Sequence, residues 1–359
     1  MVSDRETQAE YRVTGVMSGS SLDGVDLAFC CFSAGRSGWS YRILRAETIP
    51  YPPPILEQLS GASGWDRTAL RKMDVTLGHF YAEQIHSFHE RIHRIPDFIA
   101  SHGHTLIHRP ENGITFQAGN GEIMARETGL TVVNDFRKAD VAQGGQGAPL
   151  VPAGDRLLFG EYDGCLNLGG FANISYEDDI GRRIGYDICP VNLALNKLAG
   201  RAGKTFDKDG VMARQGRVGN ALLEALNHLD YYRVPPPKSL GKEWFEKEFV
   251  PVLESASDAL PDLMATVIEH ICIQISFCVR NAGMESVLVT GGGALNPMLM
   301  ERLQHHTKAR LVIPDRQLVE FKEALVFAFL GVLRVRNEIN CLASVTGGQA
   351  DLSAGEIHQ

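Results

Sequence analysis

The sequence predicts an α/β protein made of two domains with a similar layout. Its 359 residues are many for one hydrophobic core. Two strand hairpins, each closed by a glycine-rich turn, open two successive stretches in which strands and helices alternate. The repeat lies in the layout and not in residue identity. We expect domain I at 1–132 plus 339–359 and domain II at 133–338.

The first half is expected to begin with a hairpin and to continue with an αβ unit. Apolar and β-branched runs predict its strands, and the prolines at 52–54 end the third strand. A long stretch of helical periodicity follows. The expected elements are strands 11–17, 25–32 and 39–49, helix 66–93, strand 97–101, helix 121–128 and strand 131–134.

The second half repeats the hairpin theme around Gly169-Gly170 and again leads into alternating helices and strands. A second glycine run follows a short strand near the end of this half. The expected elements are strands 163–168, 172–176 and 183–187, helix 191–199, several helices up to 281, strand 286–290, a helix from 296, strand 311–314 and helix 322–337.

Composition and charge exclude several classes of partner. The net charge is −8 and the 35 Lys and Arg residues are scattered, so we expect neither a nucleic acid nor a membrane as partner. Residues 1–11 contain no apolar segment, and the longest apolar run, 324–333, is much shorter than the ~20 residues of a membrane-spanning helix. Seven cysteines without a CxxC pair suit buried thiols, which favours a cytoplasmic location.

Three glycine-rich segments are candidates for holding a polyphosphate. Glycines let backbone N–H groups approach phosphate oxygens, and hydroxyls and carboxylates add donors and a Mg²⁺ ligand. Each segment taken alone is also compatible with a plain turn. The candidate nucleotide contacts are Gly19, Ser20, Ser21, Leu22, Asp23, Gly24, Val25 and Asp26 in the first, Asn167, Gly169, Gly170 and Asn173 in the second, and Gly291, Gly292, Gly293 and Asn296 in the third.

These segments belong to a larger set of motifs that resembles one family along nearly the whole chain. The motifs are GVMSGSSLDGVD, SHGHTLIHRP, VVNDFRKADVAQGGQGAPLVP, LNLGGFANIS, VTGGGALNPMLMERL and SVTGGQ, in that order. They are similar to those of the anhydro-N-acetylmuramic acid kinases. The resemblance implies a two-domain actin-like ATPase (sugar kinase) fold with a central cleft, ATP and Mg²⁺ as cofactors, a 1,6-anhydrosugar as substrate, and a homodimer.

The resemblance also implies roles for individual residues. Asp187 matches the family's catalytic base, and Asn192 matches a substrate contact. Many relatives carry Asp-Thr-Gly-Pro-Gly-Asn where this chain has residues 187–192, Asp-Ile-Cys-Pro-Val-Asn, so we expect an altered loop there. Asp23 is the candidate for the Mg²⁺ region, and Asp26 is the alternative.

Further substrate contacts implied by the family are His102, His104, Gln117, Arg137, Asp140 and Glu323. The Arg137 guanidinium suits a carboxylate such as the sugar's lactyl group, with Asp140 orienting it. His104 stands where relatives commonly carry Gln, so its charge is expected to depend on pH. His102, His104 and His108 also permit a zinc interpretation, for which the sequence offers no fourth ligand at a recognisable spacing.

The sequence therefore predicts an ATP-dependent kinase that opens the 1,6-anhydro bond of anhydro-N-acetylmuramic acid and phosphorylates O6, in cell-wall recycling. A kinase of another anhydrosugar such as levoglucosan is the nearest alternative. A nucleotide-binding module without catalysis and a purely structural domain are the alternatives from other classes.

Overall fold

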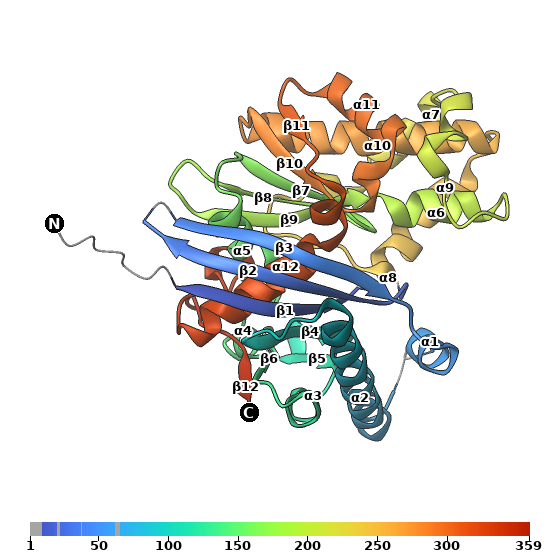
Figure 1. Cartoon of the computed structure of the whole chain (residues 1–359). Helices are drawn as coiled ribbons and strands as arrows, with labels where there is room; N and C mark the ends of the chain where they lie inside the picture. The colour runs from blue at the N-terminus through green and yellow to red at the C-terminus, as the bar shows by residue number, and fades with distance from the viewer. Residues whose placement is uncertain (1–8, 20–21, 37, 62–64) are drawn as a thin grey trace. The chain divides into compact units, whose positions relative to one another are not determined.

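The computed structural model describes residues 9–19, 22–36, 38–61 and 65–359 (Figure 1). The expected contacts at Ser20 and Ser21 lie outside these ranges. The chain divides into two compact units, unit 1 (Met1–Leu158 with Phe321–Gln359) and unit 2 (Phe159–Glu320). Each unit is built around a mixed β-sheet, and each is described separately below.

Unit 1 contains a seven-stranded sheet with the order β12-β6-β4-β1-β2-β3, in which β5 pairs with β4. Antiparallel β1, β2 and β3 form the opening meander, while β1, β4 and β6 run parallel. The strands are β1 Glu10–Ser18, β2 Val25–Gly35, β3 Gly38–Ile49, β4 Phe98–Arg109, β5 Ile114–Ala118, β6 Val132–Asn134 and β12 Glu356–His358.

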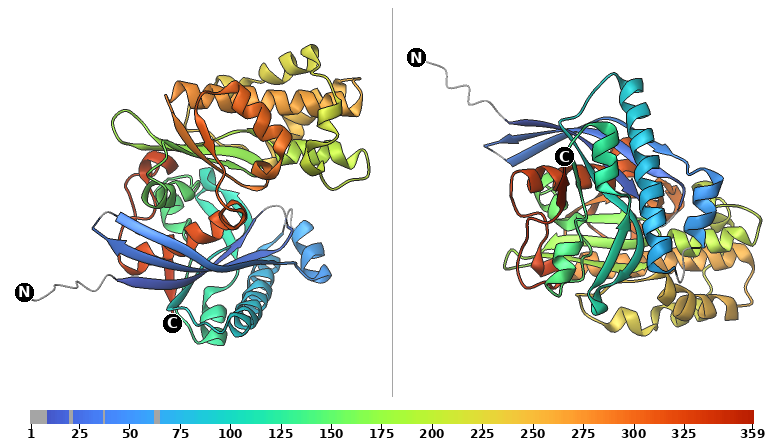
Figure 2. Two further views of the ribbon diagram at one scale, coloured as in Figure 1. Left: turned by 45° about the horizontal axis from the view of Figure 1, so that its top comes forward. Right: turned by 90° about the horizontal axis from the view of Figure 1, so that it is seen from below.

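Helices cover both faces of this sheet (Figures 1 and 2). On one face α2 and α3 pack over Val16, Ile99 and other apolar residues of β1, β2 and β4. On the other face lies α12, where Phe329 contacts the rings of Phe32 and Trp39. The unit 1 helices are α1 Pro53–Ser60, α2 Arg67–Ile92, α3 Gly121–Thr128, α4 Lys138–Ala142, α5 Val151–Leu158, α12 Arg316–Val335 (from Phe321) and α13 Ala343–Thr346.

Unit 2 contains a five-stranded sheet with the order β11-β10-β7-β8-β9. Its apolar core lies between one sheet face and helices α6, α7, α9, α10 and α11. The strands are β7 Gly164–Leu168, β8 Phe171–Glu177, β9 Arg183–Pro190, β10 Ser286–Thr290 and β11 Arg310–Val312. The helices are α6 Asn192–Gly200, α7 Asn220–Asn227, α8 Lys242–Trp244, α9 Val250–Ser255, α10 Leu260–Asn281 and α11 Pro297–His306.

The two sheets share one topology. In unit 1 the order β3-β2-β1-β4-β6 combines an antiparallel meander with two parallel additions, and unit 2 repeats it as β9-β8-β7-β10-β11. The predicted α/β fold of two similarly built halves is confirmed, and the duplicated sheet is compatible with the actin-like fold that the family resemblance implies.

The unit boundaries differ from the expected domain boundaries of 132/133 and 338/339. The chain passes between units at Leu158/Phe159 and at Glu320/Phe321. The reason is strand pairing: β6 is bonded to β4 and β12, which keeps residues 133–158 with unit 1. At the second boundary α12 is interrupted at Phe321, whose φ of −114° and ψ of 15° are not helical.

Most expected elements are present within a few residues of their predicted bounds, and six were not anticipated: α1, β5, α4, α5, α13 and β12. The cysteine prediction is confirmed, since all seven are free thiols and only Cys278 is not fully buried. Helix α10 is long and apolar enough to cross a membrane, but 78% of its apolar window is buried. It forms the centre of the unit 2 core.

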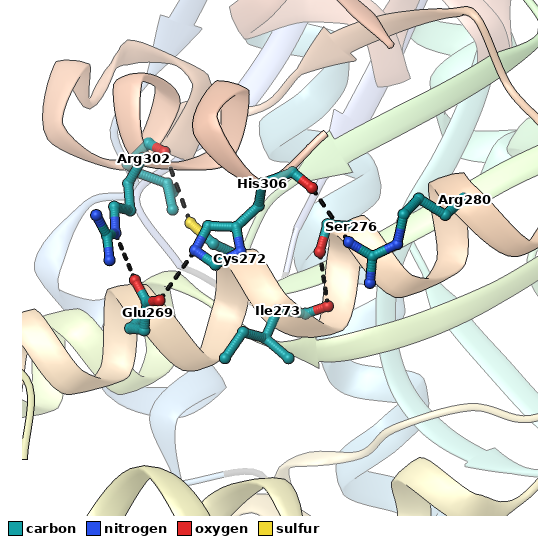
Figure 3. Close-up of polar contacts among 8 residues, drawn as sticks. Glu269, Cys272, Ile273, Ser276, Arg280, Arg302 and His306 are labelled. Atoms are coloured by element: carbon teal, nitrogen blue, oxygen red, sulfur yellow. Dashed lines mark hydrogen bonds and ion pairs between the residues drawn. The ribbon is translucent and has the colours of Figure 1, made fainter. Parts of the chain in front are cut away.

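An ionic cluster around the buried Glu269 joins α10 to α11 (Figure 3). The Glu269 carboxylate accepts from Arg302 Nε at 2.5 Å and pairs with His306 Nε2 at 2.9 Å. At the end of α11, the His306 carbonyl accepts from Arg280 at 3.2 Å. Burial acts to raise the pKa of Glu269, but Arg302 and His306 outweigh it and hold that pKa below its ordinary value.

We predict that Glu269→Gln destabilises unit 2 by about 1–3 kcal/mol at pH 7, because Arg302 and His306 lose a buried charged partner. A lowered folded-state pKa means that the stabilisation exists above the ordinary Glu pKa of about 4.3 and is lost as pH falls through the folded value. The thermal midpoints of variant and wild type should therefore converge in acid.

The matched control is Glu301→Gln on α11, since the Glu301–Arg214 pair is exposed and should change the midpoint little. Equal effects of the two substitutions at pH 7 would contradict the role given to Glu269.

Candidate active site

A row of polar side chains crosses four neighbouring strands of the unit 2 sheet. Asp187 on β9 lies opposite Asn173 on β8, and Asn173 lies opposite Asn167 on β7. Asn167 is in turn beside Thr290 on β10, whose Oγ1 is 3.5 Å from Asn167 Oδ1. Residues paired across strands project from the same face. The sheet therefore brings together the expected catalytic residue and two expected nucleotide contacts.

This row lies on the face of the sheet opposite the helices. Leu166 and Leu168, which flank Asn167, belong to the apolar core, as do Ala172 and Ile174 on either side of Asn173. Since side chains alternate along a strand, the two asparagines point away from that core. A polar face is thus built into the strands themselves.

Asp187 is held by one short segment of unit 2. Its Oδ2 accepts a hydrogen bond from the Leu240 N–H at 2.8 Å, and its carbonyl accepts one from the Tyr231 hydroxyl at 2.6 Å. Its own N–H donates to the Lys238 carbonyl at 3.4 Å. Residues 231–240 therefore fix both the backbone and the carboxylate of Asp187.

The electrostatic setting of Asp187 favours the protonated form. Burial raises its pKa to about 6 from the ordinary 3.8, and the hydrogen bond from Leu240 N–H only partly opposes this. A desolvated carboxylate with a pKa near neutrality can exchange protons with a substrate or water. This is the behaviour that a general base requires.

A β-bulge follows Asp187 directly. The pairing with β8 shifts between Ala172 and Asn173, which leaves Ile188 as an extra residue between Asp187 and Cys189. Bulges bend a strand and redirect the adjacent side chain, and they are common beside active sites. Here the bulge allows Asp187 to lie in the polar row while Ile188 and Cys189 both enter the core.

The altered segment after Asp187 is accommodated without left-handed backbone. Val191 has φ −120°, and neither Cys189 nor Ile188 takes a positive φ. The N–H groups of residues 191–193 donate to the carbonyls of Gly169 and Gly170 at 2.8–3.3 Å. Asn192 Nδ2 donates to the Leu168 carbonyl at 3.1 Å. The second glycine turn and the start of α6 therefore form one bonded unit.

The third glycine segment adjoins this unit. Gly291 has φ +82°, and a Cβ there would lie 2.5 Å from Asn167 Oδ1, so only glycine fits beside the polar row. A Cβ on Gly292 would lie 3.7 Å from Asn192 Nδ2. Gly293 is buried, and the Asn296 side chain caps α11 by accepting from Leu299 N–H at 3.2 Å. Asn296 thus acts in helix capping.

In unit 1 the first glycine turn joins β1 to β2. Leu22 has φ +60°, which is rare for a leucine and marks a constrained turn. Asp23 is exposed, whereas Asp26 Oδ1 accepts from Thr48 Oγ1 at 2.5 Å. Val25 is fully buried in the apolar core. Asp23 is therefore the more accessible carboxylate, and Val25 can contribute only its backbone.

A second bulge separates two of the expected histidines. Pairing of β4 with β1 skips His102, and Gly103 takes φ +72°. His102 consequently faces α12, where its ring lies 4.5 Å from that of Phe327. His104 instead bonds Ser18 Oγ through Nδ1 at 2.8 Å. The zinc interpretation is wrong, because the histidines point apart and the described part of the chain contains no cluster of three metal-ligating side chains.

Arg137 is anchored between His102 and a glycine loop. Its Nε donates to His102 Nε2 at 3.0 Å and its Nη1 donates to the Gly147 carbonyl at 2.9 Å. Burial lowers its pKa to about 10, and Glu323 counteracts this. Burial likewise raises the pKa of Glu323, with Lys322 and Arg137 opposing. Arg137 and Glu323 therefore share one electrostatic environment.

Asp140 and Arg137 are linked through the backbone of Gly147. The buried Asp140 carboxylate accepts from Gly147 N–H and from Thr346 Oγ1, both at 2.7 Å. The Gly147 carbonyl is the group that accepts from Arg137. Asp140 thus positions the loop that positions the guanidinium.

Gln117 lies elsewhere in unit 1. It is paired with Thr105 and donates to Thr115 Oγ1 at 2.8 Å, while His104 is paired with Ala118. Neighbouring pairs face opposite sides of a sheet, so Gln117 and His104 point apart. Gln117 lines a cavity of about 220 Å³ with Asp74, Asn120 and Asp135.

Sequence reasoning missed the segment that surrounds Asp187. Lys238 Nζ lies 4.4 Å from the centre of the Tyr231 ring and donates to the Tyr231 carbonyl at 3.1 Å. The only signal was the triple proline at 235–237 before Lys238, which indicates a rigid connection. Its contact with β9 spans more than 40 residues of sequence and follows no local pattern.

Comparison with known proteins agrees with the motifs. The family model "Anhydro-N-acetylmuramic acid kinase" matches residues 11–359. The anhydro-N-acetylmuramic acid kinase of Mannheimia succiniciproducens is 34% identical over 369 residues, covering 96% of this chain and 97% of that protein. The enzyme of the same name from Pasteurella multocida is 35% identical over 377 residues, covering 98% and 97%.

Among solved structures, component A of the (R)-2-hydroxyglutaryl-CoA dehydratase of Acidaminococcus fermentans is similar with a TM-score of 0.46 and 13% identity, covering 89% of this chain and 96% of that chain. The family resemblance is confirmed by the sequence matches. With its glycine turns and desolvated aspartate in place, this chain belongs to the anhydro-N-acetylmuramic acid kinase family and is a kinase that uses ATP.

Proposed function

We propose that the protein phosphorylates 1,6-anhydro-N-acetylmuramic acid with concurrent hydrolysis of its anhydro bond, giving N-acetylmuramate 6-phosphate and ADP. Two supports are the names of the relatives and the match along residues 11–359. The observation that carries the chemistry is Asp187, a desolvated carboxylate in a row with Asn173 and Asn167. This reaction would be a step of peptidoglycan recycling.

The proposed reaction needs one base and balances without further reactants. Asp187 takes a proton from a water molecule while the water oxygen bonds to the anomeric carbon. The bond between that carbon and O6 then breaks. O6 then takes the γ-phosphoryl group of ATP, and ADP leaves. The glycine turns at 169–170 and 291–293 offer backbone close to the polar row for the phosphates.

Mg²⁺ is the cofactor that we propose with ATP, and Asp23 would hold it. The exposed Asp23 carboxylate on the first glycine turn fits Mg²⁺, which commonly binds one or two carboxylates together with phosphate oxygens and water. The ion would neutralise charge on the transferred phosphoryl group.

The sugar contacts that we propose are His102, His104, Arg137, Asn192 and Glu323, with Asp140 acting on Arg137 through Gly147. Arg137 retains Nη2 without a hydrogen-bond partner among the described residues, which leaves a donor for an anionic substituent of the sugar. Gln117 remains a proposed contact on the opposite side of β4 and β5. A cytoplasmic homodimer is the proposed state of the enzyme.

We predict that Asp187→Asn lowers turnover by roughly 10²–10⁴-fold, because the amide cannot take a proton from water. ATP affinity should change little, since the glycine turns remain. The measurement is steady-state turnover together with ATP titration of the same variant. Asp179→Asn, in the exposed turn between β8 and β9, is the matched control and should keep full turnover. Turnover of D187N at the wild-type rate would exclude Asp187 as the base.

The pH profile of the wild type gives a separate prediction. The base acts as the carboxylate, and burial raises the pKa of Asp187 to about 6. Turnover should therefore be constant above that pH and fall about tenfold per unit below it. A profile that stays flat to pH 4 would show that a group with an ordinary carboxyl pKa is responsible.

Turnover in ¹⁸O-water tests the coupled hydrolysis itself. Attack of water on the anomeric carbon places the label on the sugar product, and mass analysis detects it there. Label in phosphate released from ATP, without sugar phosphate, would instead indicate a nucleotide-hydrolysing module. Parallel incubation with levoglucosan separates the nearest alternative, for which no observation speaks.

A further inference from the structure

A buried chain of hydroxyl groups leads to His104. The Tyr51 hydroxyl donates to Ser18 Oγ at 2.6 Å, and Ser18 Oγ lies 2.8 Å from His104 Nδ1. Behind Tyr51, the Tyr81 hydroxyl is 3.0 Å from the Tyr51 hydroxyl. Ser18, Tyr51, Tyr81 and His104 are all at most 8% exposed. Bulk water therefore does not compete for these hydrogen bonds.

The direction of this chain follows from proton counting. A phenol is a stronger acid than an aliphatic alcohol, so Tyr51 is the better donor to Ser18. Tyr51 has one proton, and its use toward Ser18 leaves Tyr81 as donor to Tyr51. Ser18 Oγ accepts from Tyr51, and among the described residues His104 Nδ1 is its one other hydrogen-bond partner, so we assign the Ser18 proton to Nδ1. Nδ1 is then an acceptor, and a neutral imidazole must carry its proton on Nε2.

The other end of the imidazole is placed to meet a ligand. His104 is paired with Ser18, the last residue of β1, so the parallel pairing of β1 with β4 ends at His104, beside the first glycine turn. Its Nε2 has no hydrogen-bond partner among the residues that the structure describes. His104 is only 6% exposed, and burial lowers its pKa to about 4. The ring is thus neutral at physiological pH.

We propose that Tyr51, acting through Ser18, fixes His104 as the Nε2–H tautomer and makes it a permanent hydrogen-bond donor to an acceptor oxygen of the anhydrosugar. The ligand part rests on the function proposed above, and the tautomer part does not. A carbonyl or carboxylate oxygen fits this donor, because a group with only acceptor capacity matches a ring nitrogen that can only donate. Tyr51 is a positioning residue, and His104 sets specificity.

The tautomer is tested by long-range ¹H–¹⁵N NMR on the full chain with ¹⁵N-labelled histidine, without any ligand. The spectrum of His104→Gln identifies the His104 signals by their absence. We expect a protonated Nε2 and an unprotonated Nδ1 in the wild type and in Tyr81→Phe, which removes only the group behind Tyr51. Tyr51→Phe should give a mixture of tautomers. A protonated Nδ1 in the wild type would overturn the proposal.

The ligand contact is tested by kinetics with anhydro-N-acetylmuramic acid. His104→Leu should raise the KM for the sugar by on the order of tenfold to a hundredfold, while His104→Gln, which keeps a donor, should restore most of it. The KM for ATP should not change, and Tyr51→Phe should raise only the sugar KM. Equal sugar KM values for Leu and Gln would exclude the contact. A wild type that turns over no anhydrosugar would refute the proposed function while the NMR result still decides the tautomer.

Discussion

The alternation of side chains along a β-strand is the constraint on which the site of unit 2 depends. Leu166, Leu168, Ala172 and Ile174 fill the core under the helices, so the residues between them must project from the other face. Those residues are Asn167 and Asn173, and strand pairing puts Asp187 in line with them. The apolar core and the reactive face are therefore specified by the same strands.

Two bulges adjust this alternation where chemistry requires it. The bulge at Ile188 releases the strand after Asp187 so that both following residues are buried, and the bulge at His102 sends His102 and His104 to opposite faces of β4. Without the second bulge the two imidazoles would share a face, and Ser18 could not reach His104 Nδ1. Each bulge costs ladder hydrogen bonds but redirects one candidate site residue.

Burial also sets the chemistry of Asp187 at a cost in stability. Among the described residues the Asp187 carboxylate has one hydrogen-bond partner, the Leu240 N–H, and burial raises its pKa. A nearby cation would stabilise the folded state and would also lower the pKa of the proposed base. The desolvated aspartate therefore lowers the stability of the folded state, as is common where activity depends on a perturbed group.

Local patterns predicted much of the fold, while contacts between distant residues accounted for what was missed. Glycine turns flanked by apolar runs correctly indicated β1–β2 and β7–β8, and Asp66 was placed at the start of α2, which it caps. The bulges were not visible, because a single extra residue leaves the apolar pattern unchanged. The boundaries of the compact units differ from the expected domain boundaries, because β6 is too short for the sequence to reveal its strand partners. Asn296 and Gln117 match positions of the family's motifs, but their side chains form hydrogen bonds within the protein.

The bonding of residues 191–193 to the Gly169-Gly170 turn has a consequence for how the family can diverge. A substitution that shifts the backbone after Asp187 displaces the amides that hold this turn, so the turn must adapt with it. In evolutionary terms the two stretches form one inherited unit and should covary among homologues.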